Sequence, residues 1–179
     1  ELSVPDPSKI VCVGRNYPSY HEVKEANEKL AKPSMFARFP TSFAAHGEEI
    51  RRPHSAGKLD YEGELVVVIG KPGRSILAAR ALDHVVGYTI ANEGTLRDWL
   101  WPGTQNLLAK NFDRSGGMGP WFATKDEIED VNGLAITTRR NGQAVHAGTT
   151  GSMIFDIPFL ISHISDAFSL SAGDLILTG

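Results

Sequence analysis

The stretch "KLDYEGELVVVIG", residues 58–70, decides the fold because it carries the strongest strand signal in the chain. Its run "LVVVIG" is apolar on both faces, which is typical of a strand buried inside a sheet. Glu62 and Glu64 stand at the entrance of this strand, two residues apart. Because side chains alternate across a strand, the two carboxylates are expected to point to the same side.

Two adjacent carboxylates at the start of a buried strand are costly, since like charges repel and burial removes their hydration. Either one carboxyl group is protonated or a cation lies between Glu62 and Glu64. Mg²⁺ and similar hard ions prefer carboxylate oxygens and keep several waters. The alternative is that both side chains simply cover a solvated strand end.

Two further residues strengthen the metal hypothesis. Glu93 directly follows "VVGYTIAN" (85–92), a second predicted strand. Three acids at the ends of neighbouring strands would form an oxygen-rich site, whereas a lone acid at a helix start would only cap that helix. Lys110 lies between an apolar run and a glycine-rich loop. It could stabilise an oxyanion beside a metal, or it could be an ordinary surface lysine.

Two other groups of polar residues are candidates for chemistry. His21, Glu22 and Glu25 lie in "SYHEVKEANEKLA" (19–31), a predicted helix. His21 and Glu25 share a helix face, so an imidazole oriented by a carboxylate could take a proton from water. Many surface helices carry such a pair without function. Thr149 and Thr150 precede a predicted helix, which they could cap, or they could hold a substrate carboxylate.

Length and composition restrict the class of protein. The chain has 179 residues, a net charge of −3 and 41% hydrophobic residues, which favours a single globular domain over 1–179. No basic patch or long apolar run points to a nucleic-acid or membrane partner. Cys12 is the single cysteine, so no disulfide can form within the chain, and a cytoplasmic location is expected. The first residue is not methionine and the last ends a strand, so we expect further chain beyond both ends.

Short predicted strands outnumber helices, so we expect a mainly β domain with flanking helices (α+β) rather than a doubly wound sheet. Asn141–Gly142 predicts a hairpin turn within 134–148. Helices are predicted over 76–85 and over 153–168, the second with a kink at Pro158. The remaining strands are predicted at 9–14, 34–39 and 173–179.

Eight stretches of this sequence, in the same order, resemble the catalytic C-terminal domain of the fumarylacetoacetate hydrolase superfamily. They are "KIVCVGRNY", "FARFPTSFAAHGEEI", "LDYEGELVVVIG", "GYTIANEGTLRDW", "KNFDRSGGMGPW", "TTRRNGQ", "TTGSMIF" and "GDLILTG". The resemblance implies a mixed β-roll or sandwich, a homodimer, and one Mg²⁺ or Mn²⁺ ion.

The resemblance also implies roles for individual residues. Those roles are metal ligation for Glu62, Glu64 and Glu93, catalysis for Lys110 and for His21 with Glu25 or Glu22, and substrate binding for Thr150, Arg15, Tyr17 and Arg38. Two positions depart from the family pattern. Glu93 stands where relatives usually carry aspartate, and Lys24 stands where they carry the glutamate that follows the histidine by three residues.

Members of the superfamily act on small 2-oxo or enol acids. We therefore expect a divalent-metal-dependent hydrolase that cleaves a C–C bond in a 2,4-dioxo acid such as an acylpyruvate, through an enolate. The alternative is an isomerase, tautomerase or decarboxylase of a 2-oxo or 2-hydroxydienoic dicarboxylic acid. A third hypothesis, from another class, is a non-catalytic binding relative whose metal site is impaired by Glu93.

Overall fold

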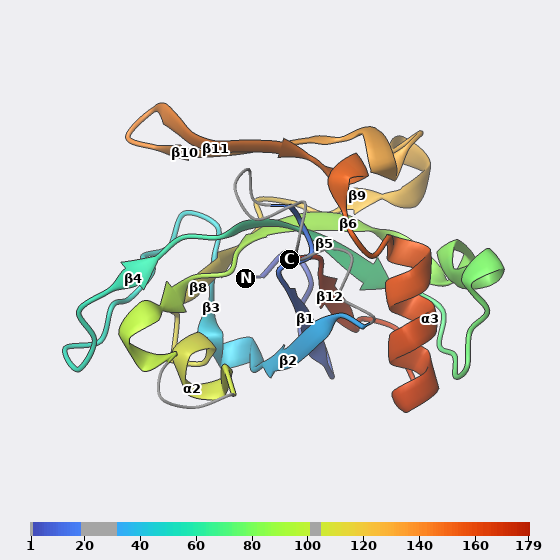
Figure 1. Cartoon of the computed structure of the whole chain (residues 1–179), viewed down its shortest axis with the longest axis horizontal. Coiled ribbons are helices and arrows are strands. Elements are labelled where there is room, and N and C mark those ends of the chain that lie inside the picture. Colours follow the sequence, from blue (N-terminus) through green and yellow to red (C-terminus); the bar gives the residue numbers. More distant parts are fainter. Residues whose placement is uncertain (1, 19–31, 101–104) are drawn as a thin grey trace.

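The computed structural model describes residues 2–18, 32–100 and 105–179 (Figure 1). Its main feature is a curled, mixed, eight-stranded sheet in which the strands follow the order β2-β1-β12-β5-β6-β8-β3, with β9 paired to β6. The pairs β1–β12 and β3–β8 are parallel, and the other pairs are antiparallel. The strands of this sheet are β1 (Ile10–Gly14), β2 (Ser34–Arg38), β3 (Phe43–Ala45), β5 (Gly63–Ile69), β6 (Val85–Asn92), β8 (Gly116–Met118), β9 (Ala123–Thr124) and β12 (Leu175–Leu177).

Smaller elements surround the main sheet. Two pairs of strands stand apart from it, β4 (Leu59–Asp60) with β7 (Thr95–Leu96), and β10 (Ala135–Arg140) with β11 (Gln143–Thr149). The α-helices are α2 (Leu107–Lys110) and α3 (Ile157–Ala167). The 3-10 segments are η2 (Pro40–Ser42), η3 (Ala78–His84), η4 (Arg97–Trp99), η5 (Lys125–Glu127), η6 (Val131–Gly133) and η7 (Thr150–Ser152).

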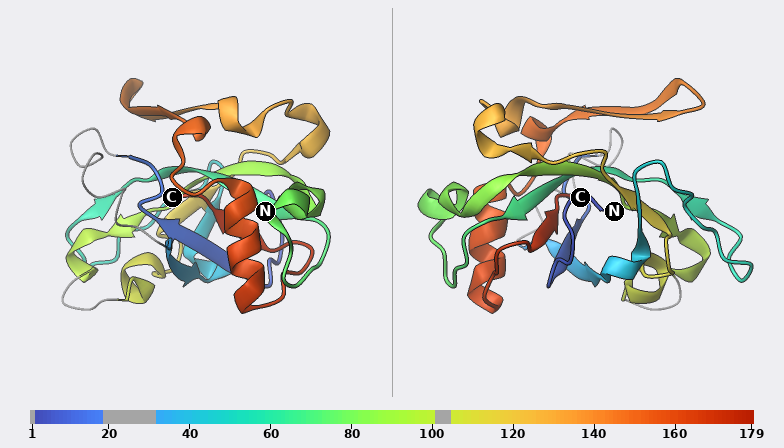
Figure 2. Two further views of the ribbon diagram at one scale, coloured as in Figure 1. Left: turned by 45° about the vertical axis from the view of Figure 1, so that its right-hand side comes forward. Right: turned by 180° about the vertical axis from the view of Figure 1, so that it is seen from behind.

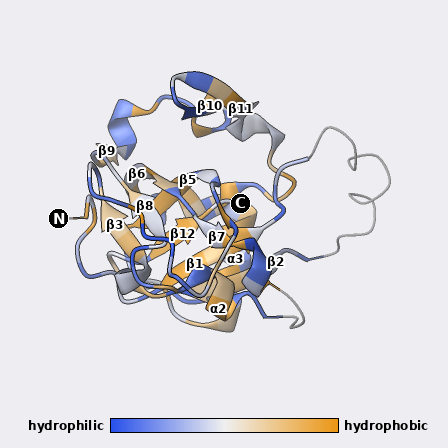
Figure 3. Ribbon diagram, turned by 90° about the vertical axis from the view of Figure 1, so that its left-hand side faces the viewer, coloured by the Kyte–Doolittle hydropathy of each residue, from blue (hydrophilic) through white to orange (hydrophobic). Residues whose placement is uncertain are grey.

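Strand β5 is buried on both faces, as its sequence predicts. Leu65, Val67 and Ile69 pack into a core beneath α3, and Val66 and Val68 pack into a second core on the other side of the sheet. Each such side chain contributes about 1.5–3 kcal/mol when it is fully buried. Apolar residues accordingly concentrate in the main sheet (Figure 3). This double burial fixes which face Glu62 and Glu64 occupy.

The predicted hairpin is confirmed in β10 and β11. Asn141 and Gly142 take the left-handed conformation, with φ of 52° and 82°, that a tight hairpin turn needs. The two strands pair with each other and lie across the main sheet (Figures 1 and 2). They therefore cover the end of the sheet at which the central strand β5 begins.

Two helix predictions need correction. The helix predicted over 153–168 begins only at Ile157, because Asp156 caps it by accepting a hydrogen bond of 2.8 Å from the Phe159 backbone N–H. Pro158 lies in the first turn, where no backbone N–H is required, so it starts the helix instead of kinking it. The segment predicted as a helix over 76–85 forms the 3-10 segment η3. The helix predicted over 19–31 lies outside the described residues.

The predicted fold class, mainly β with flanking helices, is confirmed. Strands lie where they were predicted at 9–14, 34–39, 64–70, 85–92 and 173–179, with ends that shift by a few residues. In the described part of the chain, every helix is too short or too polar to cross a bilayer.

Candidate active site

Three carboxylates meet where β5 begins and β6 ends. The two strands are antiparallel, and Gly63 is paired with Asn92, so Glu62 and Glu64 on either side of Gly63 lie next to Glu93. The Glu93 backbone N–H donates a 2.7 Å hydrogen bond to the Glu62 carbonyl oxygen. One oxygen atom from each of the three carboxylates lies within 4.8 Å of the others. The pairing of two strands thus assembles the acids that the sequence places far apart.

Lys110 is buried inside this acidic cluster. Its Nζ donates hydrogen bonds of 2.8 Å to Glu62 Oε2 and of 2.7 Å to Glu93 Oε2. The residue ends α2, and its Nζ also lies 5.1 Å from the centre of the Phe36 ring. The alternative of a surface lysine is therefore wrong, because a side chain that is 5% exposed cannot extend into solvent.

Arg38 supplies a second buried positive charge behind Glu93. Its Nη1 lies 3.6 Å from Glu93 Oε1, and its guanidinium packs on the Phe43 ring. Burial lowers the pKa of Arg38, while Glu93 raises it. The other donors of the guanidinium bind Ser42, Gly94 and Ser115. Arg38, predicted to bind substrate, is thus placed behind the carboxylates rather than along the cavity described below.

Glu64 forms an ion pair with neither Lys110 nor Arg38, which contact Glu62 and Glu93 instead. Burial raises the pKa of Glu64 well above its usual value, and the nearby Glu93 carboxylate raises it further. Glu93 Oε1 is buried and has no hydrogen-bond partner among the described residues. A buried carboxylate oxygen without a donor is an unsatisfied acceptor. The three acids therefore fit a hard divalent cation, and Glu93 reaches the cluster although it is longer than aspartate.

The raised pKa of Glu64 predicts a pH-dependent stability for the metal-free protein. The folded state holds a proton on Glu64 more tightly than the unfolded state does, so this stabilisation is present at low pH. It is lost as the pH rises from about 4.5, the ordinary pKa of a glutamate, through the folded-state pKa. In EDTA, Glu64→Gln should raise the Tm at pH 7–8 by several degrees, since roughly 1 kcal/mol corresponds to about 2–4 °C.

The measurement is thermal unfolding in EDTA from pH 5 to pH 8. Glu129→Gln, which changes an exposed carboxylate, is the matched control and should leave the pH profile unchanged. A Glu64→Gln variant that is less stable than the natural chain at every pH would contradict the inference that burial disfavours the charged Glu64 carboxylate.

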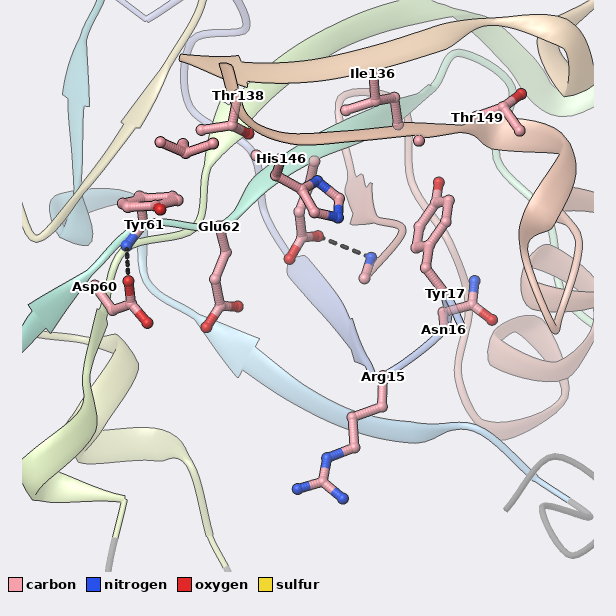
Figure 4. A pocket seen from close by; sticks show the side chains of 15 residues that line it. Arg15, Asn16, Tyr17, Asp60, Tyr61, Glu62, Ile136, Thr138, His146 and Thr149 are labelled. Carbon is pink, nitrogen blue, oxygen red and sulfur yellow. Dashed lines mark hydrogen bonds between the residues drawn. The ribbon is translucent and has the colours of Figure 1, made fainter. Parts of the chain in front are cut away.

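A cavity of about 380 Å³ opens over the carboxylates (Figure 4). Its floor includes Glu62 and Glu64, and the β10–β11 hairpin forms its roof. The remaining lining residues come from the segment after β1, from Asp60 and Tyr61, and from the C-terminal Gly179, whose N–H donates a 2.8 Å hydrogen bond to Glu64 Oε2. A small acid could therefore reach the carboxylate cluster from the open side.

Three consecutive residues after β1, of which Arg15 and Tyr17 are predicted to bind substrate, line this cavity. Arg15 lines it from a left-handed backbone conformation, with φ of 57°. Tyr17 also lines it, and its hydroxyl lies 3.1 Å from Thr178 Oγ1. Asn16 is held by Phe155 and by the Thr178 carbonyl, so it fixes the segment that carries its two neighbours.

Thr150 is placed differently from its predicted substrate-binding role. Its hydroxyl donates to the Val131 carbonyl and accepts a 3.0 Å hydrogen bond from the Leu134 backbone N–H. The side chain is buried, and its polar atom is already used by the backbone. The neighbouring Thr149 lines the cavity instead and caps η7 through Gly151 N–H.

The catalytic pair predicted from His21, with Glu25 or Glu22, lies outside the described residues. Arg97 pairs with Asp60 at 3.0 Å and with Glu62 at 2.8 Å. Asp98 accepts hydrogen bonds from the Gly57 and Lys58 backbone N–H groups.

Sequence reasoning overlooked His146, which lines the cavity from β11. No local signal identifies it, because it is an isolated histidine in a hairpin strand with exposed residues.

Comparison with known proteins finds a matching family model and similar sequences. A family model described as "Fumarylacetoacetate (FAA) hydrolase C-terminal" matches residues 9–179. The chain is 40% identical over 176 residues to the mitochondrial oxaloacetate tautomerase FAHD2A of Homo sapiens, with 97% of this chain and 55% of that protein covered. It is 39% identical over 180 residues to oxaloacetate tautomerase YisK of Bacillus subtilis (strain 168), with 98% and 60% covered.

Solved structures agree with these sequence matches. The chain superimposes on the 2-hydroxyhepta-2,4-diene-1,7-dioate isomerase from Mycobacterium marinum with a TM-score of 0.85 and 36% identity, covering 97% of this chain and 63% of that one. The chain therefore spans only part of the length of the relatives it matches, between 55% and 60% for the two tautomerases.

Proposed function

This chain belongs to the fumarylacetoacetate hydrolase family through its C-terminal catalytic domain, and from that membership we propose that it is a divalent-metal-dependent tautomerase or isomerase of a small 2-oxo dicarboxylic acid. The observation that carries the proposal is the carboxylate cluster of Glu62, Glu64 and Glu93 beneath an open cavity, with one buried oxygen lacking a donor. The relatives named as oxaloacetate tautomerases and as a dienedioate isomerase support this reaction class.

The three carboxylates would hold the cation, and Mg²⁺ and Mn²⁺ both suit a set of oxygen ligands. When bound, such an ion supplies Lewis-acid stabilisation of negative charge on a carbonyl oxygen. Lys110 holds Glu62 and Glu93 in place through two hydrogen bonds, and an ammonium group has a third N–H left to donate. That donor would further stabilise negative charge beside the cluster.

A dicarboxylic substrate needs a second cationic contact, and the arginines of this site are not equivalent. Arg38 is buried behind Glu93, and Arg97 is engaged by Asp60 and Glu62. Arg15 lines the cavity from an exposed position (Figure 4). We therefore assign the second carboxylate to Arg15, because a guanidinium binds a carboxylate through two parallel hydrogen bonds.

Hydrolysis of a C–C bond would need an additional group that activates water. The sequence assigns that role to His21 with Glu25 or Glu22, which lie outside the described residues. Tautomerisation and isomerisation need only proton transfer beside a stabilised enolate. The third hypothesis, a binding protein with an impaired metal site, is weakened because Glu93 reaches the other two carboxylates.

The test is to follow enol and keto oxaloacetate by ultraviolet absorbance, with Mg²⁺, Mn²⁺ or EDTA. We expect the protein to accelerate interconversion only when a divalent ion is present. Glu93→Gln should lower Mn²⁺ affinity by at least about 100-fold, because loss of a ligand should exceed the roughly 10–100-fold cost of losing an outer-shell partner.

Glu129→Gln serves as the control and should change neither affinity nor rate. Release of pyruvate from an acylpyruvate, without tautomerase activity, would instead favour the hydrolase. Activity that arises only in Glu93→Asp would mark the natural chain as a non-catalytic relative.

Two further expectations belong to the proposal. The resemblance favours a homodimer that acts on a small molecule. The lone Cys12 favours a cytoplasmic location, whereas the human relative is named as mitochondrial. Sedimentation of the purified protein checks the first expectation, and fractionation of the source cells checks the second.

A further inference from the structure

A glycine lets the hairpin that roofs the cavity approach the strand that carries Glu62 and Glu64. Gly63 lies between Glu62 and Glu64, and a Cβ atom at this position would clash with Thr138 Oγ1 of β10. The missing side chain therefore lets the hairpin approach the start of β5. Thr138 is paired across the hairpin with His146, so both side chains are on the same face.

His146 consequently projects toward the reaction space. It lines the cavity, and Figure 4 shows its imidazole suspended from the hairpin between Glu62 and Tyr17, on the far side from Arg15. The ring is not a member of the carboxylate cluster. It thus faces the open volume where a substrate above Glu62 and Glu64 would lie.

Among the residues that the structure describes, the other ionisable groups facing the cavity are unsuited to accept a proton from a substrate. Glu62 and Asp60 are paired with Arg97, and Glu62 also binds Lys110. Burial raises the pKa of Tyr17, which keeps the phenol protonated at neutral pH. The remaining ionisable groups that face His146 are Glu64, Tyr61 and Arg15.

Each of these three groups is also a poor base. Glu64 accepts a hydrogen bond from Gly179 N–H and belongs to the metal cluster. The Tyr61 phenol carries its own proton to donate, and the Arg15 guanidinium has only donors and no acceptor. An imidazole, in contrast, has a ring nitrogen that can accept a proton and return it, and the ring of His146 faces the open cavity.

We propose that His146 is a further catalytic residue of this site, the acid–base group that moves the proton during tautomerisation. The imidazole takes a proton from the methylene carbon next to the 2-oxo group. The electrons of the broken C–H bond form the C=C bond, and those of the carbonyl π bond move to its oxygen. The imidazolium then gives the same proton to that oxygen, so the enol has the same atoms as the keto acid.

This inference rests on the proposed function, and oxaloacetate is the probe. His146→Gln should lower kcat by about 10²–10⁴-fold, the usual contribution of a positioned acid–base group, while KM changes little. Exchange of the methylene protons in D₂O, followed by NMR, should slow by the same factor. Mn²⁺ affinity, measured by calorimetry, should match that of the natural chain, because His146 is outside the carboxylate cluster.

Chemical rescue separates catalysis from structure. Added imidazole should restore part of the activity of His146→Ala, and the limb of the pH–rate profile that requires a neutral base should be absent from His146→Gln. His46→Gln, in the exposed turn after β3, is the matched control and should behave like the natural chain.

Unchanged kcat in His146→Gln, or a loss of rate that follows a loss of Mn²⁺ affinity, would overturn the assignment of His146 while the proposed function stands. A natural chain that binds Mn²⁺ but does not interconvert oxaloacetate would overturn both the proposed function and this assignment.

Discussion

Lys110→Met should destabilise the metal-free protein by about 3–5 kcal/mol, the usual cost of removing one partner from a buried ion pair. The ammonium group lies within 2.8 Å of carboxylate oxygens of Glu62 and Glu93, and it is almost completely buried. Methionine keeps most of the length and the packing against Phe36 but removes the charge. Urea unfolding in EDTA measures the loss.

Excess Mn²⁺ should recover much of the stability of this variant, because a divalent ion neutralises the same carboxylates and binds only the folded chain. Activity should stay low even in Mn²⁺, because the donor beside the substrate oxygen is missing. Lys58→Met, at an exposed position, is the control and should change neither property. If Lys110→Met were as stable as the natural chain in EDTA, the ion pairs of Lys110 with Glu62 and Glu93 would not be what offsets the cost of burying these carboxylates.

Gly94→Ala should cost about 3 kcal/mol or more in the free energy of unfolding, which corresponds to roughly 6–12 °C in Tm. A Cβ atom at Gly94 would clash with the backbone oxygen of Ser115, the residue before β8, and this backbone cannot move aside as a side chain can. The Gly94 carbonyl also accepts a 3.2 Å hydrogen bond from Arg38. Because Glu93 is the preceding residue, Mn²⁺ affinity should fall together with the Tm.

Gly117→Ala is the matched control for this variant in the same region of the sheet. A Cβ atom there would lie 3.4 Å from Ile50 Cδ1, the end of a flexible side chain. We expect a change within about 1 kcal/mol and normal Mn²⁺ affinity. Equal effects of the two substitutions, measured by thermal unfolding and calorimetry, would show that the close approach at Gly94 does not hold Glu93 in position.

The parts of the structure that sequence patterns predict correctly are those set by local geometry. The apolar run of β5 indicates burial on both faces, and Asn141–Gly142 indicates the hairpin turn because few residue pairs adopt two positive φ angles. The wrongly predicted start of the helix that contains Pro158 also has a local cause. Its apolar periodicity extends past the true helix start, and only the cap at Asp156 shows where the helix begins.

The predictions that needed a partner distant in the chain were less complete. Residue patterns left a surface position open for Lys110, but α2 places it between two carboxylates. Thr150 matches a family motif, yet its hydroxyl is used by the Val131 and Leu134 backbone. His146 has no local pattern, because its position over the cavity depends on how closely the hairpin approaches Gly63.

The sequence by itself determined the longer strands, the hairpin turn and the shared side of Glu62 and Glu64, because two-residue alternation and turn chemistry act between near neighbours. Only the tertiary structure decided which cations balance those acids and which groups face the cavity. Pairing of β5 with β6 brings Glu93 to the cluster, and the packing of α2 and the hairpin adds Lys110 and His146. Such contacts depend on strand register and packing between distant segments, which local residue patterns do not encode.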